Sequence, residues 1–303
     1  MIGVQDLANG VMLGAIIGLG AVGLTLTYSI LGFANFAHGE LITGGAYAAL
    51  TLLWLLAAAV GWGLGQWGPL SFGGPFVLLL ATAMALTAGL ALGLEHGLFR
   101  PLRRRGTMIG LVIASFGASL ALRSLVAFGW GPEPHYYTRE IAMAREVLPG
   151  VRVTADQLFV LALAAALMVA LHLMLTRTTL GRAMRAMSEN SALLAVTGID
   201  PTAVARWTCV IGGGLAAVAG VLIGLTVQVR PLLGFDLLLP LFAAVILGGV
   251  GSVYGALAGS LIVGLAEALA VPLIGAEYRA AVAFLVLIAV LVLRPTGLGG
   301  ARP

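Results

Sequence analysis

The segment 176-TRTTLGRAMRAMSENSALLAVTGIDP-201 is polar and lies between two long apolar runs. Arg182, Arg185 and Glu189 recur at steps of three and four residues, so they share one face of a predicted helix, with Arg185 and Glu189 at ion-pair spacing. The other face is small and apolar (Ala183, Met184, Ala186 and Met187). This pattern predicts an amphipathic helix outside the membrane core.

Turn chemistry marks the end of this helix. Gly198 suits the left-handed residue just past a helix end, and Ile199 is the apolar residue expected after it. Asp200 and Pro201 are typical of the N-cap and first residue of a new helix. We expect residues 176–206 to protrude from a membrane and to dock on a soluble partner.

The alternative for this segment is an amphipathic helix that lies on the lipid surface. Docking is favoured because its polar face carries Glu189 and Asn190 as well as arginines.

Composition identifies the chain as a membrane protein. Of its 303 residues, 60% are hydrophobic and 9% charged, whereas a soluble protein carries about 25% charged residues. The net charge of +4 does not indicate nucleic-acid binding, because the arginines lie in the predicted loops. The single cysteine, Cys209, excludes an internal disulfide. The first ten residues have no basic stretch, so the first apolar run is expected to be a retained span.

The predicted fold is an all-α polytopic membrane protein, with residues 1–303 as one transmembrane domain. A spanning helix needs about 20 apolar residues. The apolar runs cover residues 7–31, 38–60, 76–98, 107–128, 157–175, 206–229, 237–250, 253–272 and 279–293. Two of these runs are short and the stretch 31–40 is interrupted, so eight or nine spans fit the pattern, with 31–40 and 237–259 open to a re-entrant course.

Arginines predict the orientation. If the runs alternate across the membrane, most loop arginines fall on one side (Arg100, Arg103, Arg104, Arg105, Arg177, Arg182, Arg185, Arg206, Arg294 and Arg302). Fewer fall on the other (Arg139, Arg145, Arg152, Arg230 and Arg279). Since basic loops stay in the cytoplasm, nine spans place the N-terminus outside and the C-terminus inside.

The sequence contains no lysine: all 16 basic residues are arginine. A phosphate-binding loop of the G-x-x-x-x-G-K-[ST] type needs its lysine on the phosphates. If ATP drives this protein, ATP and magnesium therefore bind to another chain, and we expect no cofactor or metal in this one.

Two glycine-dense stretches interrupt the apolar pattern. In 31-LGFANFAHGELITGGAY-47, Asn35, His38 and Glu40 are polar groups in an apolar context, where ionisable residues are candidates for a functional path. In 247-LGGVGSVYGALAG-259, Gly249 and Ser252 occupy the matching point of the second half. The alternative is that both stretches are ordinary turns whose polar residues cap and pack.

The whole chain resembles the LivH-type permease of branched-chain amino-acid ABC importers. Four stretches carry the resemblance: FANFAHGELITGGAY (33–47), LGRAMRAMSENSALLAVTGID (180–200), AAVILGGVGSVYGALAGSLIVGLAEAL (243–269) and RPTGLGG (294–300). One departure is Asn190, where some relatives carry an acid, which affects the expected docking contact.

The resemblance implies a multi-pass permease subunit of the bacterial inner membrane that carries branched-chain amino acids inward. It implies four partners: a second, LivM-like permease, two cytoplasmic ATP-binding subunits and a periplasmic substrate-binding protein. Arg182, Arg185, Glu189, Asn190 and Gly198 are then the ATPase-docking residues. Asn35, His38, Glu40, Gly249 and Ser252 are the residues of the substrate path.

Three alternatives remain open. Permeases for urea and short amides share these motifs. An ion-coupled transporter would need paired intramembrane acids, and only Glu40, Glu95 and Glu267 are available in the spans. A membrane enzyme would need catalytic or metal-binding groups, but the four histidines occur singly and no H-E-x-x-H motif is present.

Overall fold

The computed structural model describes residues 3–61, 63–105, 107–138, 143–294 and 296–299. In this part of the chain, eight helices are long and apolar enough to cross a membrane. The first half contains α1 (Val4–Leu31), α2 (Ala37–Val60), α3 (Pro75–Leu94), α4 (Arg100–Arg105) and α5 (Met108–Trp130). A π-helical turn, Glu95–Phe99, joins α3 and α4 into one span.

The second half begins with a hairpin of β1 (Arg145–Leu148) and β2 (Val151–Val153). Its helices are α6 (Ala155–Arg177), α7 (Thr179–Glu189), α8 (Ser191–Val196), α9 (Pro201–Thr226), α10 (Leu233–Gly248), α11 (Val253–Ile274) and α12 (Arg279–Leu293). A 3-10 turn, Ala276–Tyr278, precedes α12. The helices correspond to the predicted runs, so the all-α polytopic fold is confirmed; the hairpin was not predicted because its strands are only three and four residues long.

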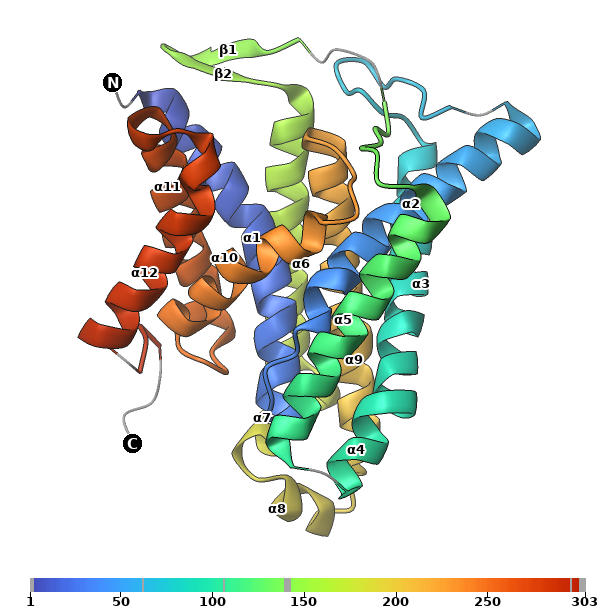
Figure 1. The fold of residues 1–303 in the computed structure, drawn as a ribbon, viewed down its shortest axis with the longest axis vertical. Helices are drawn as coiled ribbons and strands as arrows, with labels where there is room; N and C mark the ends of the chain where they lie inside the picture. Colours follow the sequence, from blue (N-terminus) through green and yellow to red (C-terminus); the bar gives the residue numbers. More distant parts are fainter. Residues whose placement is uncertain (1–2, 62, 106, 139–142, 295, 300–303) are drawn as a thin grey trace.

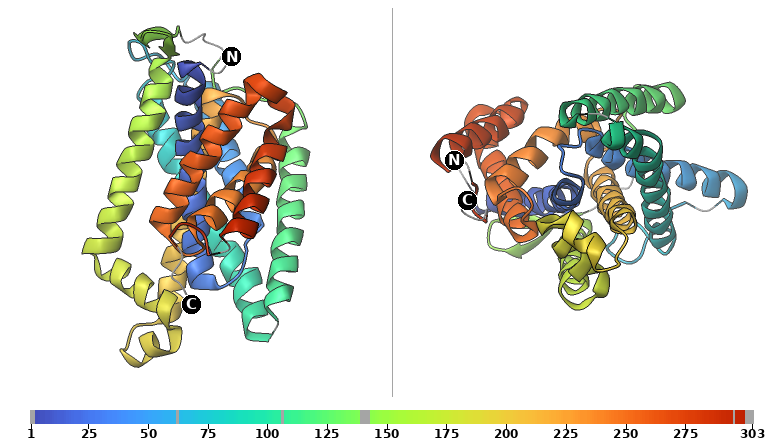
Figure 2. Two further views of the ribbon diagram at one scale, coloured as in Figure 1. Left: turned by 90° about the vertical axis from the view of Figure 1, so that its left-hand side faces the viewer. Right: turned by 90° about the horizontal axis from the view of Figure 1, so that it is seen from below.

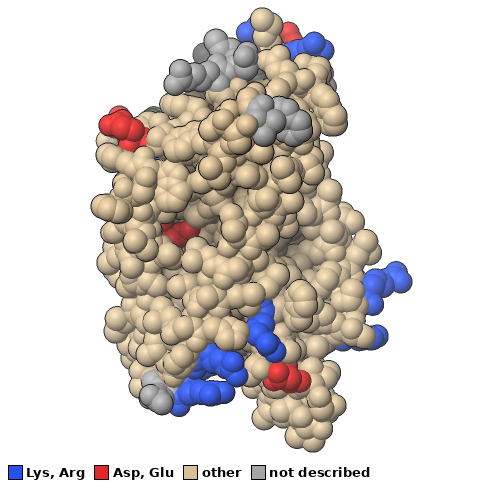
Figure 3. Space-filling model, turned by 90° about the vertical axis from the view of Figure 1, so that its right-hand side faces the viewer, with Lys and Arg blue, Asp and Glu red and all other residues tan. Residues whose placement is uncertain are grey.

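The two ends of the bundle differ. The N-terminus lies beside the β-hairpin, and the chain ends toward the opposite end, where α7 and α8 protrude (Figure 1). On the face drawn in Figure 3, arginine side chains gather in the lower half, and the surface above them is mostly uncharged, with an acidic patch in a hollow near its middle. Arg139 and Arg302, used above for orientation, lie outside the described residues.

Helices α1 and α9 form the centre of the bundle (Figure 2), and each has 78% of its apolar window buried. Glycines let the backbones approach closely. Gly10 and Gly14 of α1 pack on Leu265 and Leu261 of α11. On the other side, Gly220 of α9 packs against the carbonyl of Ile42 in α2.

Two helices begin inside the bundle instead of at its ends. His38 in the first turn of α2 lies 3.0 Å, Nε2 to carbonyl oxygen, from Gly20 of α1. Gly20 precedes the end of α1 by eleven residues, or about 17 Å at the helical rise. The backbone of Gly39 in turn contacts Gly234 at the start of α10. Both α2 and α10 therefore begin near mid-depth, after the irregular segments 32–36 and 227–232.

Arg230 lies between α9 and α10, in one of the loops that alternation of the runs predicted. This loop contacts the loop after α5, since Val229 pairs with His135 as an isolated β-bridge, and it then leads to the buried start of α10. The short run predicted over 237–250 is a 16-residue helix, shorter than the about 20 residues that a span needs, and it starts in the interior.

Close packing at Gly220 gives a stability test. Gly220→Ala would push a methyl group into the carbonyl of Ile42, and overpacking of this kind costs about 1–3 kcal/mol. We expect a lower midpoint of thermal unfolding for the purified protein. Gly89→Ala on α3 is the control, since its added methyl meets no atom within 4 Å. Equal midpoints for the two variants would contradict the packing argument.

Candidate functional site

The protruding element at one end consists of α7 and α8. Thr178 caps α7 by accepting a hydrogen bond from the backbone of Gly181 at 3.1 Å. The helix was predicted to continue to Gly198, but it stops at Asn190. There, the side-chain Oδ1 of Asn190 accepts bonds from the N–H groups of Ala192 and Leu193, both at 3.0 Å, and so caps α8. A short polar side chain competes for backbone N–H groups in this way, which is why one predicted helix is two.

The amphipathic faces of α7 agree in part with the sequence pattern. Arg182, Arg185 and Glu189 are exposed, and Ala183 and Met184 are buried, but Met187 is half-buried and Ala186 is exposed. The predicted ion pair between Arg185 and Glu189 is absent from the described residues. Instead, the Arg185 guanidinium donates to the carbonyl of Leu175, near the end of α6, where a cation is favoured. Arg185 therefore also fixes the angle between α6 and α7.

The turn between α8 and α9 is confirmed. Gly198 has a φ of +83°, and Pro201 is the first residue of α9. The Asp200 carboxylate accepts hydrogen bonds from the hydroxyl and backbone N–H of Thr202, which lower the pKa of Asp200. These bonds cap α9 and set the direction in which it enters the bundle.

His38 and Asn35 hold the start of α2. The His38 side chain is fully buried and its ring lies against Gly23. The carbonyl of Asn35 accepts a bond from the His38 N–H at 3.2 Å, and its side-chain Oδ1 accepts one from Ala37 at 3.1 Å. Asn35 thus pairs two N–H groups that the start of α2 leaves without a partner in the helix, whereas His38 adds a side-chain bond to a carbonyl in the middle of α1.

Glu40 lies at the start of a line of polar and charged groups. Its side chain is 2% exposed, Oε1 accepts a bond from the Ser119 hydroxyl at 3.2 Å, and Oε2 has no hydrogen-bond partner among the described residues. One turn along α5, the guanidinium carbon of Arg123 lies 4.6 Å from the centre of the Phe235 ring. Glu40 is close enough to Arg123 and Asp236 to interact with both electrostatically.

Asp236 and Arg230 complete this line. The Arg230 Nη2 and Asp236 Oδ2 atoms are 2.9 Å apart, and both side chains are about half exposed. The sequence pattern missed Arg123, Arg230 and Asp236 as site candidates. A signal was available for two of them, because Arg123 lies within a predicted span and Asp236 directly precedes another.

Cavities lie on both sides of the Arg230–Asp236 pair. One, of about 340 Å³, lies between α1, the end of α9 and α10, and includes Arg230, Asp236 and Arg279 in its wall. The other, of about 490 Å³, is lined by residues that include Arg123, Gln228 and Arg230.

Gly249 and Ser252 lie nearer the α7–α8 end. Gly249 has a φ of +93°, and the Ser252 hydroxyl caps α11 by accepting from Gly255 at 3.1 Å. Ser252 lines a cavity of about 430 Å³ with residues of α1 and Ser188 of α7. Gly251 bonds to Thr25, so the two glycine-dense stretches contact α1 at successive levels, near Gly20 and near Thr25.

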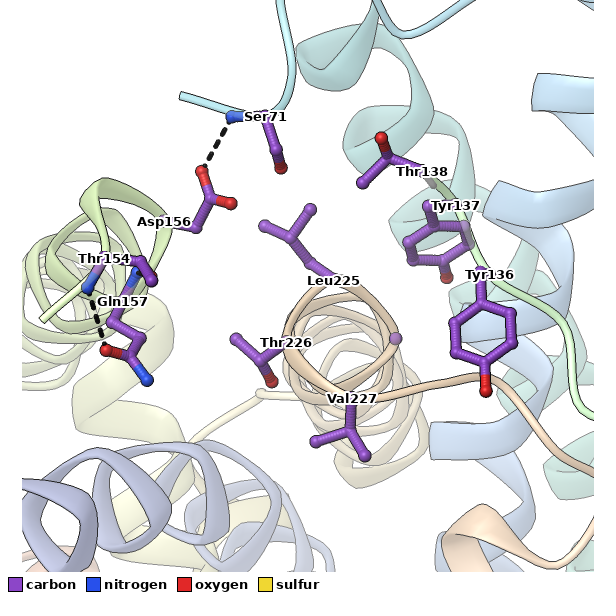
Figure 4. A pocket seen from close by; sticks show the side chains of 11 residues that line it. Ser71, Tyr136, Tyr137, Thr138, Thr154, Asp156, Gln157, Leu225, Thr226 and Val227 are labelled. Atoms are coloured by element: carbon purple, nitrogen blue, oxygen red, sulfur yellow. Dashed lines mark hydrogen bonds between the residues drawn. The ribbon is translucent and has the colours of Figure 1, made fainter. Parts of the chain in front are cut away.

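A fourth cavity, of about 270 Å³, lies at the hairpin end. Asp156 and Ser71 lie on one side of it and Tyr136 and Tyr137 on the other (Figure 4). The Asp156 carboxylate accepts a bond from the Ser71 N–H at 2.9 Å.

No group of three potential metal ligands occurs within the residues that the structure describes. The cavities, the charged side chains beside them and the short helix α10 suit passage of a polar solute through a membrane.

Comparison with known proteins agrees with this geometry. The chain is 35% identical to the high-affinity branched-chain amino acid transport system permease protein BraD of Pseudomonas aeruginosa, over 99% of this chain and 96% of that protein. It is 34% identical to the corresponding permease protein LivH of Escherichia coli, with the same coverage.

A solved structure shares the fold. The PsaBC protein of Streptococcus pneumoniae, solved in complex with Fab, matches with a TM-score of 0.51 at 12% identity, over 96% of this chain and 93% of that one. The model of the family described as the branched-chain amino acid transport system permease component matches residues 7–291. The chain therefore belongs to the family of permease components of branched-chain amino acid transport systems.

Proposed function

We propose that this multi-pass membrane protein is a permease subunit of an ATP-driven importer that carries branched-chain amino acids into a bacterial cell. The observation that carries the proposal is near-full-length similarity to two permeases named for high-affinity transport of these amino acids. A periplasmic binding protein would deliver the substrate at the hairpin end, and a second, LivM-like permease would complete the path.

The same proposal orients the chain in the inner membrane. The positive-inside rule favours a cytoplasmic location for the arginine-rich α7–α8 end and for the C-terminus. Two ATP-binding subunits, which hold ATP and magnesium, would dock there. In support, the free face of α7 carries Arg182, Arg185 and Glu189, and Asn190 and Gly198 fix the shape of the segment.

For the path, we infer a division of roles among the candidate residues. Glu40 lies beside the charged line between the cavities, whereas His38 and Asn35 support the backbone that positions it. Gly249 and Ser252 border the inner part of the path, next to the cavity of about 430 Å³.

Transport by the reconstituted complex tests the function. With the two permeases, the ATP-binding subunits and the binding protein in proteoliposomes, uptake of labelled leucine and valine is expected to require ATP. Unlabelled urea or acetamide is not expected to compete. Uptake that persists without the ATP-binding subunits would indicate a secondary transporter, and competition by urea would indicate an amide permease.

Docking can be tested at Glu189. Exposed charge pairs contribute about 0–1 kcal/mol each, so single alanines are expected to be mild. Glu189→Arg reverses a charge and is expected to uncouple ATP hydrolysis from uptake. A cysteine at position 189 should crosslink to the ATP-binding subunit, while one at position 133, also exposed but at the other end, should not. Labelling of position 189 by an impermeant reagent from the periplasm would rule out this orientation.

Gly198 tests the shape of the docking segment separately from its charges. A Cβ at this position meets no atom within 4 Å, so only its positive φ restricts substitution. Gly198→Val is expected to release the ATP-binding subunits during purification, whereas Gly198→Asn should retain them, because asparagine tolerates this conformation and valine does not. Equal subunit retention in the two variants would argue against a role for the turn.

A further inference from the structure

Charged side chains occur in this protein at a depth where lipid would not tolerate them. Gly39, the residue after His38, contacts Gly234, and the His38 side chain bonds to Gly20 in the middle of α1. Asp236 follows Gly234 by two residues and is held to Arg230 at 2.9 Å. Half-exposed charges at this level must face a water-filled cavity or another protein, because facing hydrocarbon is too costly.

The Arg230–Asp236 pair lies at the boundary between two cavities. Arg230 and Gln228 line both of them, and Asp236 lines the cavity of about 340 Å³. Arg230, Asp236 and Arg279 are the charged residues that line that cavity, and the rest of its wall includes the aliphatic side chains of Met12, Leu13, Ile16 and Leu237. A site with this division suits a ligand that is charged at one end and aliphatic at the other.

Both signs of charge are present at the Arg230–Asp236 pair. Arg123 stacks on Phe235, next to Asp236, and is close enough to act on the Asp236 carboxylate. The first turn of α10 adds the positive end of a helix dipole at the same place. Behind them, Glu40 is buried with one carboxyl oxygen unpartnered among the described residues, so this group has a bonding capacity that the fold does not use.

We propose that Arg230 and Asp236, with Arg123, form a transient binding site for the charged headgroup of a zwitterionic amino acid on its way through the membrane. The substrate carboxylate binds the two arginines and its ammonium binds Asp236, so that the Arg230–Asp236 pair opens around the ligand and closes behind it. The aliphatic wall receives the side chain. The substrate class rests on the proposed function; the assignment of these three residues is independent of the similarity to known permeases.

The site recognises what all amino acids share. Its charges contact the headgroup, and the wall makes no directional bond to the side chain. The binding free energies of leucine and valine therefore differ by no more than the burial of about one methylene group. Selectivity among amino acids is therefore expected to arise before the substrate reaches this level.

The test compares variants of the pair in the reconstituted complex. Asp236→Asn preserves the side-chain shape and removes the negative charge, whereas Arg230→Gln removes the positive charge and shortens the side chain. Each variant is expected to lower the initial rate of uptake by about tenfold or more, because a hydrogen bond to a charged group of the substrate is lost. The decrease should be the same for leucine and for valine. The stimulation of ATP hydrolysis by the loaded binding protein should remain, because docking is not altered.

A charge swap separates binding from structure. In the double variant Arg230→Asp with Asp236→Arg the ion pair can re-form, but Arg123 and the start of α10 still require a carboxylate at the original position. We expect the thermal unfolding midpoint to rise above those of the single variants Arg230→Asp and Asp236→Arg, without recovery of uptake. Recovery of uptake by the swap would show that the pair has only a structural role and would overturn the proposal.

The matched control is Thr82→Ala, which removes a polar side chain in the middle of α3 whose hydroxyl bonds to carbonyls of its own helix and which lines none of the cavities described above. Its uptake is expected to equal that of the wild type. Wild-type rates in the Arg230 and Asp236 variants would refute this inference while leaving the proposed function intact. Failure of the wild-type complex to take up either amino acid would instead refute the proposed function.

Discussion

The contact between the backbones of Gly39 and Gly234 is the constraint on which the interior of this protein depends. A membrane interior offers no water to pair with free N–H and carbonyl groups, so a chain that leaves the helical conformation at depth must satisfy these groups with protein. Here two such interruptions, 32–36 and 227–232, lie next to each other. Side chains complete the pairing: the Thr43 hydroxyl accepts from the Gly234 N–H at 2.9 Å, and the Ser115 hydroxyl accepts from Phe36 at 3.1 Å.

Because the two interruptions meet, groups from distant parts of the sequence gather at one level. Glu40 arrives from α2, Ser119 and Arg123 from α5, and Asp236 from α10. None of these charges could remain in a continuous lipid-facing helix without a large energetic penalty. Because α10 is short and begins inside the bundle, it leaves space for the cavities beside it and places charges at their boundary. Gly39 and Gly234 permit this arrangement, because residues without a side chain let the two backbones come into contact.

The shape of the protruding α7–α8 segment has a different origin. Its shape depends on local interactions that short peptides also use: the caps from Thr178, Asn190 and Asp200, and the left-handed Gly198. One tertiary bond modifies it, because Arg185 donates to the end of α6 instead of pairing with Glu189. A rigid element built from caps can transmit motion between a soluble partner and the helices that it joins, α6 and α9, without unfolding.

The sequence by itself determined the membrane class, the positions of the spans and the turn at Gly198–Pro201, because these depend on composition and on contacts within a few residues. It also marked the 31–47 stretch as unusual, since polar groups among glycines break an apolar pattern. The depth at which α2 and α10 begin, the bond between His38 and Gly20, and the meeting of Arg123, Arg230 and Asp236 were decided only by the tertiary structure. The physical reason is that these features depend on contacts between different helices, such as Gly39 with Gly234 and Arg123 with Phe235. Hydropathy along the chain measures how apolar a segment is, but carries no information on which other segment satisfies its backbone.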